Sequence, residues 1–177
     1  MRCSTGDGPV PYSPQLMYLG AMTIRALQPE EEWRGWLGLR ELLWKDTPEQ
    51  VLLGEMEGIL ANPARNAVFI AESPLNSAGF PFHLLAGFAE VTLRDSVEGC
   101  ATRPVGYVEA WYVAPASRRK GLGRQLLEAA EQWVLSRGYT EIASDPGLKN
   151  EVNVLAYRAL GYSEGTRPML FRKKLID

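Results

Sequence analysis

The residues best suited to chemistry form one short basic segment, which reads RRKGLGR near the middle of the chain. Its two glycines let the backbone curl closely around a ligand. An apolar repeat at helical spacing begins inside the segment, so it holds the first turn of a predicted helix, whose N–H groups have no partners within the helix. Those donors, the helix dipole and the cationic side chains together predict a cradle for a pyrophosphate. The cradle residues are Arg118, Arg119, Lys120, Gly121, Leu122, Gly123 and Arg124.

Two other nucleotide-binding motifs do not fit this segment. A Walker loop needs a Ser or Thr after a Gly-Lys pair, and the chain offers none. A dinucleotide fingerprint needs a third glycine three residues after Gly123, where the chain has Leu126. A basic turn that is simply solvated remains the alternative for these residues taken alone.

Two carboxylates lie on or at the end of predicted strands that flank the cradle in the sequence. Glu109 lies on the strand that precedes it, and Asp145 ends the next predicted strand. Parallel strands whose C-terminal ends face one crevice commonly place ligand groups there. Such a pair could bind a polyamine and accept its proton, directly or through water. The alternatives are a solvated strand residue and a turn residue before a proline.

Regular elements must position these groups. Tyr107–Val113 is rich in aromatic and β-branched residues and predicts a strand, which Pro115 ends because proline has no N–H for a ladder. After the cradle, an apolar repeat predicts a helix that ends near Gly138, a residue suited to left-handed geometry. The repeat consists of Leu122, Leu126, Ala130, Trp133 and Val134.

The rest of the chain predicts further elements in a definite order. They are a strand Met22–Leu27, a helix Pro29–Trp44, a helix that starts at Thr47 and ends near Asn62, strands Asn66–Glu72, Leu84–Arg94 and Thr140–Ser144, a helix Asn150–Leu160 and a terminal hairpin Tyr162–Leu175. The full order is β-α-α-β-β-β-α-β-α-β-β. It predicts an α/β (α+β) fold with one mixed, mostly antiparallel sheet and helices on both faces.

The two consecutive helices carry clear signals. Thr47-Pro48-Glu49-Gln50 predicts a helix start with Thr47 as the cap and Gln50 reaching back to it. The buried residues expected on that helix are Val51, Leu52, Met56, Ile59 and Leu60. The preceding helix carries three tryptophans, most simply core residues. Trp44 is the expected exception, because it ends its helix beside an acidic turn that contains Asp46, and loops between helices often line sites.

Composition narrows the class of protein. The chain has 177 residues, 46% of them hydrophobic and 23% charged, which is typical of one globular domain. The formal charge of −2 argues against general nucleic-acid binding and mildly favours a cationic partner. Cys3 and Cys100 are too few for a disulfide framework, and no leader or membrane span is evident, so we expect a cytoplasmic protein that binds no membrane. Residues 1–21 lack periodicity and are expected to form a loose arm before a domain at 22–177.

The element order and the Arg-x-x-Gly-x-Gly segment after a hydrophobic strand resemble the GCN5-related N-acetyltransferases (GNAT). In that family the loop amides hold the pyrophosphate of acetyl-CoA. The preceding strand splays from its neighbour and pairs with the pantetheine and the acetyl oxygen. The resemblance implies the same fold, acetyl-CoA as co-substrate, no metal, and cofactor contacts through the backbone of Trp111, Tyr112 and Val113.

A second motif strengthens the resemblance. NEVNVLAYRALGY places Asn150 seven residues before Tyr157, which precedes Leu-Gly-aromatic as in the family. The resemblance implies that both residues meet the cofactor and that Tyr157 protonates the departing thiolate. A phenol of pKa near 10 is protonated at neutral pH and can do so. The alternative is that the Tyr157 ring packs against the sheet. Asn153 stands where a small residue is more usual.

Longer stretches resemble one branch, the aminoglycoside 6'-N-acetyltransferases, across nearly the whole chain after Met22. They are WRGWLGLRELLW, EGCATRPVGYVEAWYVAPASRRKGLG, EIASD and ALGYSEGTRPMLFRKKL. The resemblance implies direct acetyl transfer in a ternary complex to the 6'-amino group of a cationic aminoglycoside. Glu109 and Asp145 would meet its ammonium groups, with Trp44 near the same cleft. Homodimers are common in this branch.

Three other functions stay open. The acceptor could be a protein N-terminus, a lysine or a small polyamine. The chain could be a non-catalytic acyl-CoA sensor. It could also be a hydrolase with Cys100 as nucleophile and His83, the only histidine, as base, although no activating neighbour of Cys100 is evident. No His/Cys cluster has the spacing of metal ligands.

Overall fold

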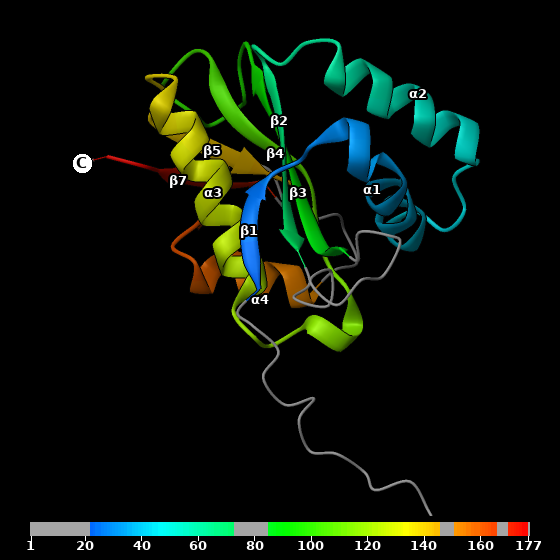
Figure 1. The fold of residues 1–177 in the computed structure, drawn as a ribbon. Helices are drawn as coiled ribbons and strands as arrows, with labels where there is room; N and C mark the ends of the chain where they lie inside the picture. The colour runs from blue at the N-terminus through cyan, green and yellow to red at the C-terminus, as the bar shows by residue number, and fades with distance from the viewer. Residues whose placement is uncertain (1–21, 73–84, 146–150, 166–169, 177) are drawn as a thin grey trace, which may run out of the picture.

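One seven-stranded sheet runs through the residues that the computed structural model describes, which are 22–72, 85–145, 151–165 and 170–176 (Figure 1). Its strand order is β1-β2-β3-β4-β5-β7-β6, and only β4 and β5 pair in parallel. The strands are β1 Thr23–Ala26, β2 Asn66–Glu72, β3 Leu85–Arg94, β4 Val105–Val113, β5 Glu141–Ser144, β6 Ser163–Glu164 and β7 Phe171–Lys174. The predicted mixed, mostly antiparallel sheet is confirmed.

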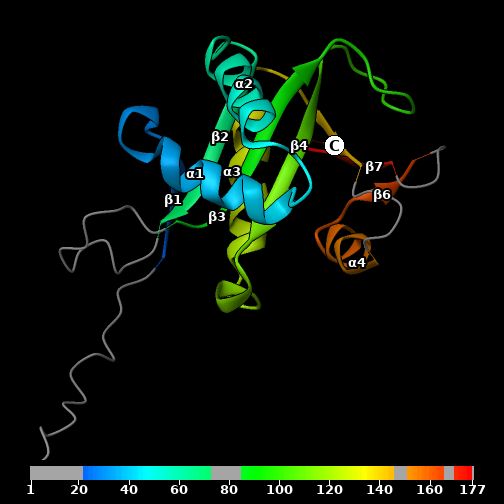
Figure 2. The same cartoon turned by 90° about the vertical axis from the view of Figure 1, so that its right-hand side faces the viewer.

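Helices cover both faces of this sheet, as predicted (Figure 2). On one face α1 (Pro29–Leu43) and α2 (Glu49–Leu60) bury Trp36, Leu52 and Met56 against strand residues such as Phe88. On the other face α3 (Leu122–Ser136) and α4 (Glu151–Ala159) pack against the opposite side chains of the same strands. Gly138 follows α3 with φ of 83°, which confirms the expected left-handed residue.

Strand β4 is irregular at one position. Opposite β3, Val108 pairs with Val91 and Ala110 pairs with Glu90, so Glu109 is an extra residue without a partner in this ladder. Such a bulge bends a strand and re-aims a side chain. On its other edge β4 pairs with β5 only from Gly106 to Val108. The two strands then part, and the second half of β4 has no neighbour in β5.

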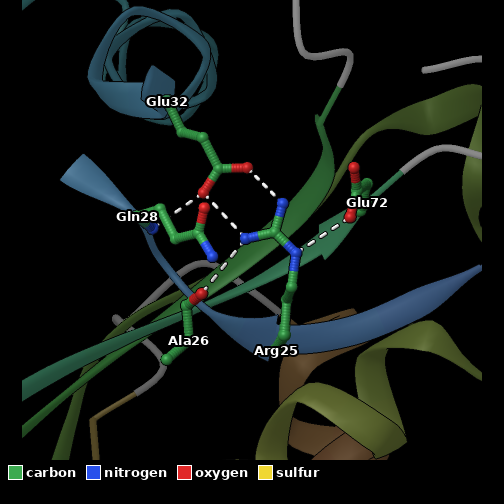
Figure 3. A network of polar contacts seen from close by, with 5 residues as sticks. All are labelled: Arg25, Ala26, Gln28, Glu32 and Glu72. Carbon is green, nitrogen blue, oxygen red and sulfur yellow. Dashed lines mark hydrogen bonds and ion pairs between the residues drawn. The ribbon is translucent and has the colours of Figure 1, made fainter. Parts of the chain in front are cut away.

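An ionic network fastens the first strand to the first helix (Figure 3). Arg25 on β1 donates from both terminal nitrogens to Glu32 on α1 and from Nε to Glu72 on β2, the last at 2.8 Å. The backbone N–H of Gln28 also donates to Glu32 at 2.7 Å. These bonds raise the pKa of Arg25 and keep Glu32 satisfied although it is buried.

Some sequence predictions about the helix pair were wrong. The helix α2 starts at Glu49 after Pro48, and no side-chain cap bond forms, so Thr47 does not cap it. Val51 and Leu60 are 47% and 37% exposed, because only the narrow face with Leu52 and Met56 meets the sheet. Among the tryptophans of α1, Trp36 is fully buried but Trp33 is exposed and stacks with Arg34. The arm 1–21, His83 and Asn150 lie outside the described residues.

Candidate active site

The predicted cradle borders a cavity of about 490 Å³ between β4, α3 and α4. Seven of the predicted cofactor residues line it: Trp111, Tyr112, Val113, Arg118, Arg119, Leu122 and Gly123. Leu43 and Asn153, which the sequence did not single out, line it as well. The predicted residues Lys120, Gly121 and Arg124 are exposed at the start of α3 but do not line the cavity.

Backbone geometry opens the start of α3 toward this cavity. Gly121 has φ of 81°, a conformation that L side chains rarely adopt, and the helix begins directly after it. The first helical hydrogen bond at this end runs from Gln125 N to Gly121 O at 3.1 Å. By helix geometry the N–H groups of the three residues between them have no partner within the helix. The geometry suits an anion, and the pyrophosphate site itself stays a prediction.

The second glycine serves a purpose that the sequence did not indicate. A Cβ atom on Gly123 would lie 2.8 Å from Cζ2 of Trp111, closer than carbon atoms pack. The indole ring therefore fills the space that a side chain at 123 would need. Through this contact β4 sets where α3 begins.

The cradle's cations are partly held by backbone oxygens. Arg118 donates from Nε to the Val113 carbonyl at 2.9 Å, and its guanidinium lies 5.8 Å from the centre of the Tyr112 ring. Lys120 donates from Nζ to the Ala116 carbonyl at 3.2 Å. Arg118 is thus fixed on the wall of the cavity, which lowers the entropy lost when it binds an anion.

A second cavity of about 220 Å³ adjoins the first, and the two share Leu43, Trp111 and Asn153. It brings together residues that the sequence placed far apart. Trp44, Glu109, Asp145 and Tyr157 all line it. Ser144, which the sequence analysis missed, lines it too. The predicted substrate residue Asp46 is exposed and lines none of the described cavities.

Tyr157 is buried at the floor of this second cavity, only 2% exposed. Its ring packs against Trp111, Tyr162 and Phe171, with centroids 5.0–5.7 Å apart. Its hydroxyl oxygen lies 2.8 Å from Ser144 Oγ. Burial raises the pKa of Tyr157 well above its usual value, so the phenol stays protonated at neutral pH. The alternative that the ring packs in the core is confirmed, whereas the role of Tyr157 as an acid stays a prediction for a residue that also lines the cavity.

The carboxylate of Glu109 is paired with Arg94. Arg94 donates to it twice, from Nε to Oε1 at 2.9 Å and from Nη2 to Oε2 at 2.7 Å. The guanidinium also lies 3.4 Å from the centre of the Tyr107 ring. This bidentate pair fixes the direction of the carboxylate. This pair was not predictable from the sequence, because the pairing depends on the β3–β4 register.

A third cavity of about 420 Å³ continues from the second, with Trp44 and Glu109 common to both. Arg40 and Glu90, which are 1% and 3% exposed, form its inner wall. Arg40 donates to Glu90 Oε1 at 2.6 Å and also to Glu55, and Trp36 donates to Glu90 at 2.8 Å. Burial raises the pKa of Glu90, while Arg40 opposes that rise. The sequence did not single out Arg40 or Glu90, so this pair was also missed.

The remaining candidates gain no support as catalysts. Burial raises the pKa of the Cys100 thiol, and the nearby carboxylate of Glu141 adds to this, so the thiolate is disfavoured. Among the described residues no group of three or more His, Cys, Asp or Glu side chains could hold a metal ion. No helix in that part of the chain is both long and apolar enough to span a bilayer.

Comparisons with known proteins agree with this geometry. Aminoglycoside N(6')-acetyltransferase type 1 of Klebsiella aerogenes is 40% identical over 144 residues, covering 79% of this chain and 89% of that protein. The enzyme of the same name from Stenotrophomonas maltophilia is 38% identical over 160 residues, covering 90% and 97%. A solved structure of AAC(6')-Iy with the bisubstrate analogue CoA-S-monomethyl-acetylneamine matches with a TM-score of 0.72 at 31% identity, covering 88% of this chain and 99% of that one.

A family model supports the same assignment over most of the fold. The acetyltransferase (GNAT) family model matches residues 36–162, from α1 through the cradle to the end of α4. The AAC(6')-Iy structure with CoA matches with a TM-score of 0.74 at 32% identity. With the cradle at the start of α3 and the parting of β4 from β5, these matches show that the chain belongs to the GNAT acetyltransferase family.

Proposed function

We propose that this protein transfers the acetyl group of acetyl-CoA to the 6'-amino group of an aminoglycoside, directly and within a ternary complex. One observation carries the proposal: a cavity at the glycine-rich start of α3 adjoins, through shared lining residues, a second cavity lined by two carboxylates. The similarity to enzymes named aminoglycoside N(6')-acetyltransferase supports the choice of acceptor.

The cofactor is proposed to lie along the first cavity. Its pyrophosphate meets the N–H groups at the start of α3 and the cations of the cradle. Its pantetheine follows the half of β4 that has left β5, where the strand edge at Trp111–Val113 has no partner in β5. We keep Asn150 as a proposed cofactor contact from its motif, together with Lys120, Gly121 and Arg124. The thioester then lies where the two cavities meet.

The acceptor is proposed to enter through the second and third cavities. Glu109 and Asp145 bind its ammonium groups, and the ring of Trp44 forms a wall for its sugars. Attack on the thioester requires a neutral amine, and a carboxylate can take its proton directly or through water. The oxyanion that forms needs a preorganised donor, worth about 2.7–4 kcal/mol. A freed backbone N–H of β4 is the proposed donor.

The leaving group is proposed to take its proton from Tyr157. This phenol is protonated, lines the second cavity and packs directly on Trp111, which borders both cavities. Protonation lets the sulfur leave as a neutral thiol, which leaves more readily than a thiolate.

We also propose a domain organisation for this function. The catalytic domain spans residues 22–177, and the arm 1–21 is not needed for it. A homodimer and a cytoplasmic location remain predictions from the resemblance and the composition. Nucleic acid is not a proposed partner, given the net charge of −2.

The direct test is acetyl-CoA-dependent modification of a kanamycin-class substrate. We expect a mass increase of one acetyl group, with NMR locating it on the 6'-nitrogen. Peptide N-termini, lysine peptides and spermidine serve as comparison acceptors under the same conditions. Faster turnover of one of these amines would show that it, and not an aminoglycoside, is the acceptor. Calorimetric CoA binding without transfer to any amine would instead identify an acyl-CoA sensor.

A further inference from the structure

One buried hydroxyl joins Tyr157 to the point where the two parallel strands part. Ser144 is the last residue of β5, and its partner Val108 is the last residue of β4 in that ladder. Ser144 is 2% exposed and sits between two oxygens. Its Oγ lies 3.1 Å from the Val108 carbonyl oxygen and 2.8 Å from the Tyr157 hydroxyl oxygen.

The donors of these two hydrogen bonds can be assigned by elimination. A hydroxyl has one hydrogen to donate, and a carbonyl oxygen can only accept. Ser144 therefore donates to Val108, so Tyr157 must donate to Ser144 for both bonds to exist. In this arrangement the phenol's hydrogen is directed at Ser144.

We propose that Ser144 is a positioning residue for Tyr157, whose hydroxyl turns from the Val108 carbonyl to the phenol oxygen when Tyr157 gives up its proton. The inference rests on the proposed function, because it requires Tyr157 to act as the acid. Before reaction Ser144 accepts from the phenol and holds it in place. During reaction Ser144 becomes the donor, and the developing phenolate, buried among aromatic rings, has a partner.

The acceptor nitrogen forms a bond to the acetyl carbon, and the C–S bond breaks with its electron pair going to sulfur. Tyr157 gives its hydrogen to that sulfur, which leaves as the thiol of CoA. The nitrogen, now an amide, loses one proton to water in the cleft, and water returns one proton to Tyr157. Ser144 keeps its own hydrogen throughout and only changes the oxygen to which it donates.

The experiment is a double-mutant cycle on turnover with an aminoglycoside acceptor. Ser144→Ala should lower the turnover number about 10- to 100-fold, as expected for one hydrogen bond to a charged group. Ser144→Thr keeps the hydroxyl on a strand residue and should recover most of the rate. In a Tyr157→Phe background, Ser144→Ala should cause no further loss. Ser136→Ala is the matched control, because it removes a serine bond to a backbone oxygen (2.7 Å, to Trp133) at the far end of α3, and it should change nothing.

The possible results distinguish positioning of Tyr157 by Ser144 from simple bracing of the strands and from failure of the proposed function. CoA binding by calorimetry shows whether each variant folds and keeps its cofactor cavity, and we expect wild-type affinity for all of them. If Ser144→Ala lowers turnover equally in both backgrounds, the residue only braces the strands and the inference fails. It also fails if Ser144→Thr is as slow as Ser144→Ala. A wild-type protein that binds CoA but acetylates no aminoglycoside would instead overturn the proposed function.

Discussion

Replacing Gly123 by alanine tests whether Trp111 sets the start of the cradle helix. The added Cβ would lie 2.8 Å from the indole Cζ2 and 3.3 Å from Cε2, so one of the two elements must move. The ring is confined by Tyr157, whose centroid lies 5.1 Å away. The start of α3 follows an exposed turn and moves more easily. We therefore expect the helix start to shift and its N–H groups to leave their place in the cavity.

The magnitude follows from the cost of overpacking, about 1–3 kcal/mol. CoA binding must restore the helix start, so it bears this cost, and the dissociation constant should rise about 5- to 150-fold. Alanine's better helix propensity, up to about 1 kcal/mol, favours folding and does not lower this binding cost. The assay is calorimetric titration with CoA, accompanied by urea unfolding.

Gly54→Ala is the matched control for this prediction. Gly54 lies in α2, and an added Cβ there would have no heavy atom within 4 Å. We expect unchanged CoA affinity and a gain of about 0.5–1 kcal/mol in the free energy of unfolding. A Gly123→Ala protein with both CoA affinity and turnover within twofold of wild type would refute the reasoning. Reduced turnover with normal affinity would mean that the indole ring moves instead.

Three further predictions concern the acid, the acceptor site and pH. Tyr157→Phe should lower turnover about 100-fold or more in steady-state assays and leave the dissociation constant of acetyl-CoA unchanged; equal loss of both would indicate a packing role. Asp145→Asn should raise the aminoglycoside KM about tenfold with little effect on CoA binding, and unchanged kinetics would remove it from the acceptor site. Burial raises the pKa of Glu141, but hydrogen bonds from Thr102 and Ala101 outweigh it and hold the pKa below its usual value. Glu141→Gln should therefore cost about 1–3 kcal/mol in the free energy of unfolding at pH 7, and the difference should shrink as pH falls through the carboxyl pKa; a difference constant with pH would contradict this.

Local signals predicted the order of elements well. The strand Asn66–Glu72 has the predicted bounds, because a run of β-branched and aromatic residues between turn signals has few other uses. Gly138 and Gly161 both adopt the positive φ that their places after helices require. The start of α3 at the two glycines was also predictable, because the residues that set it are contiguous.

Features that depend on register were not predictable. The bond between Arg94 and Glu109 requires two antiparallel strands to pair at one offset with a bulge between them. The pair of Arg40 and Glu90 joins residues 50 positions apart, across a helix–sheet contact. The prediction that Thr47 caps α2 was wrong for a different reason. Pro48 has an extended backbone, and the first turn starts after it without a side-chain hydrogen bond. Local sequence does not encode such long-range geometry.

The bulge in β4 has a consequence for how this enzyme could diversify. Val108 and Ala110, the neighbours of Glu109, belong to the cores on opposite faces of the sheet, and the ladder with β3 continues on both sides. The inserted residue serves neither core. Substitution at 109 should therefore cost less in folding than substitution of its neighbours, which are tied to hydrophobic packing. If Glu109 binds the acceptor as proposed, this position can change acceptor preference more freely than the positions beside it.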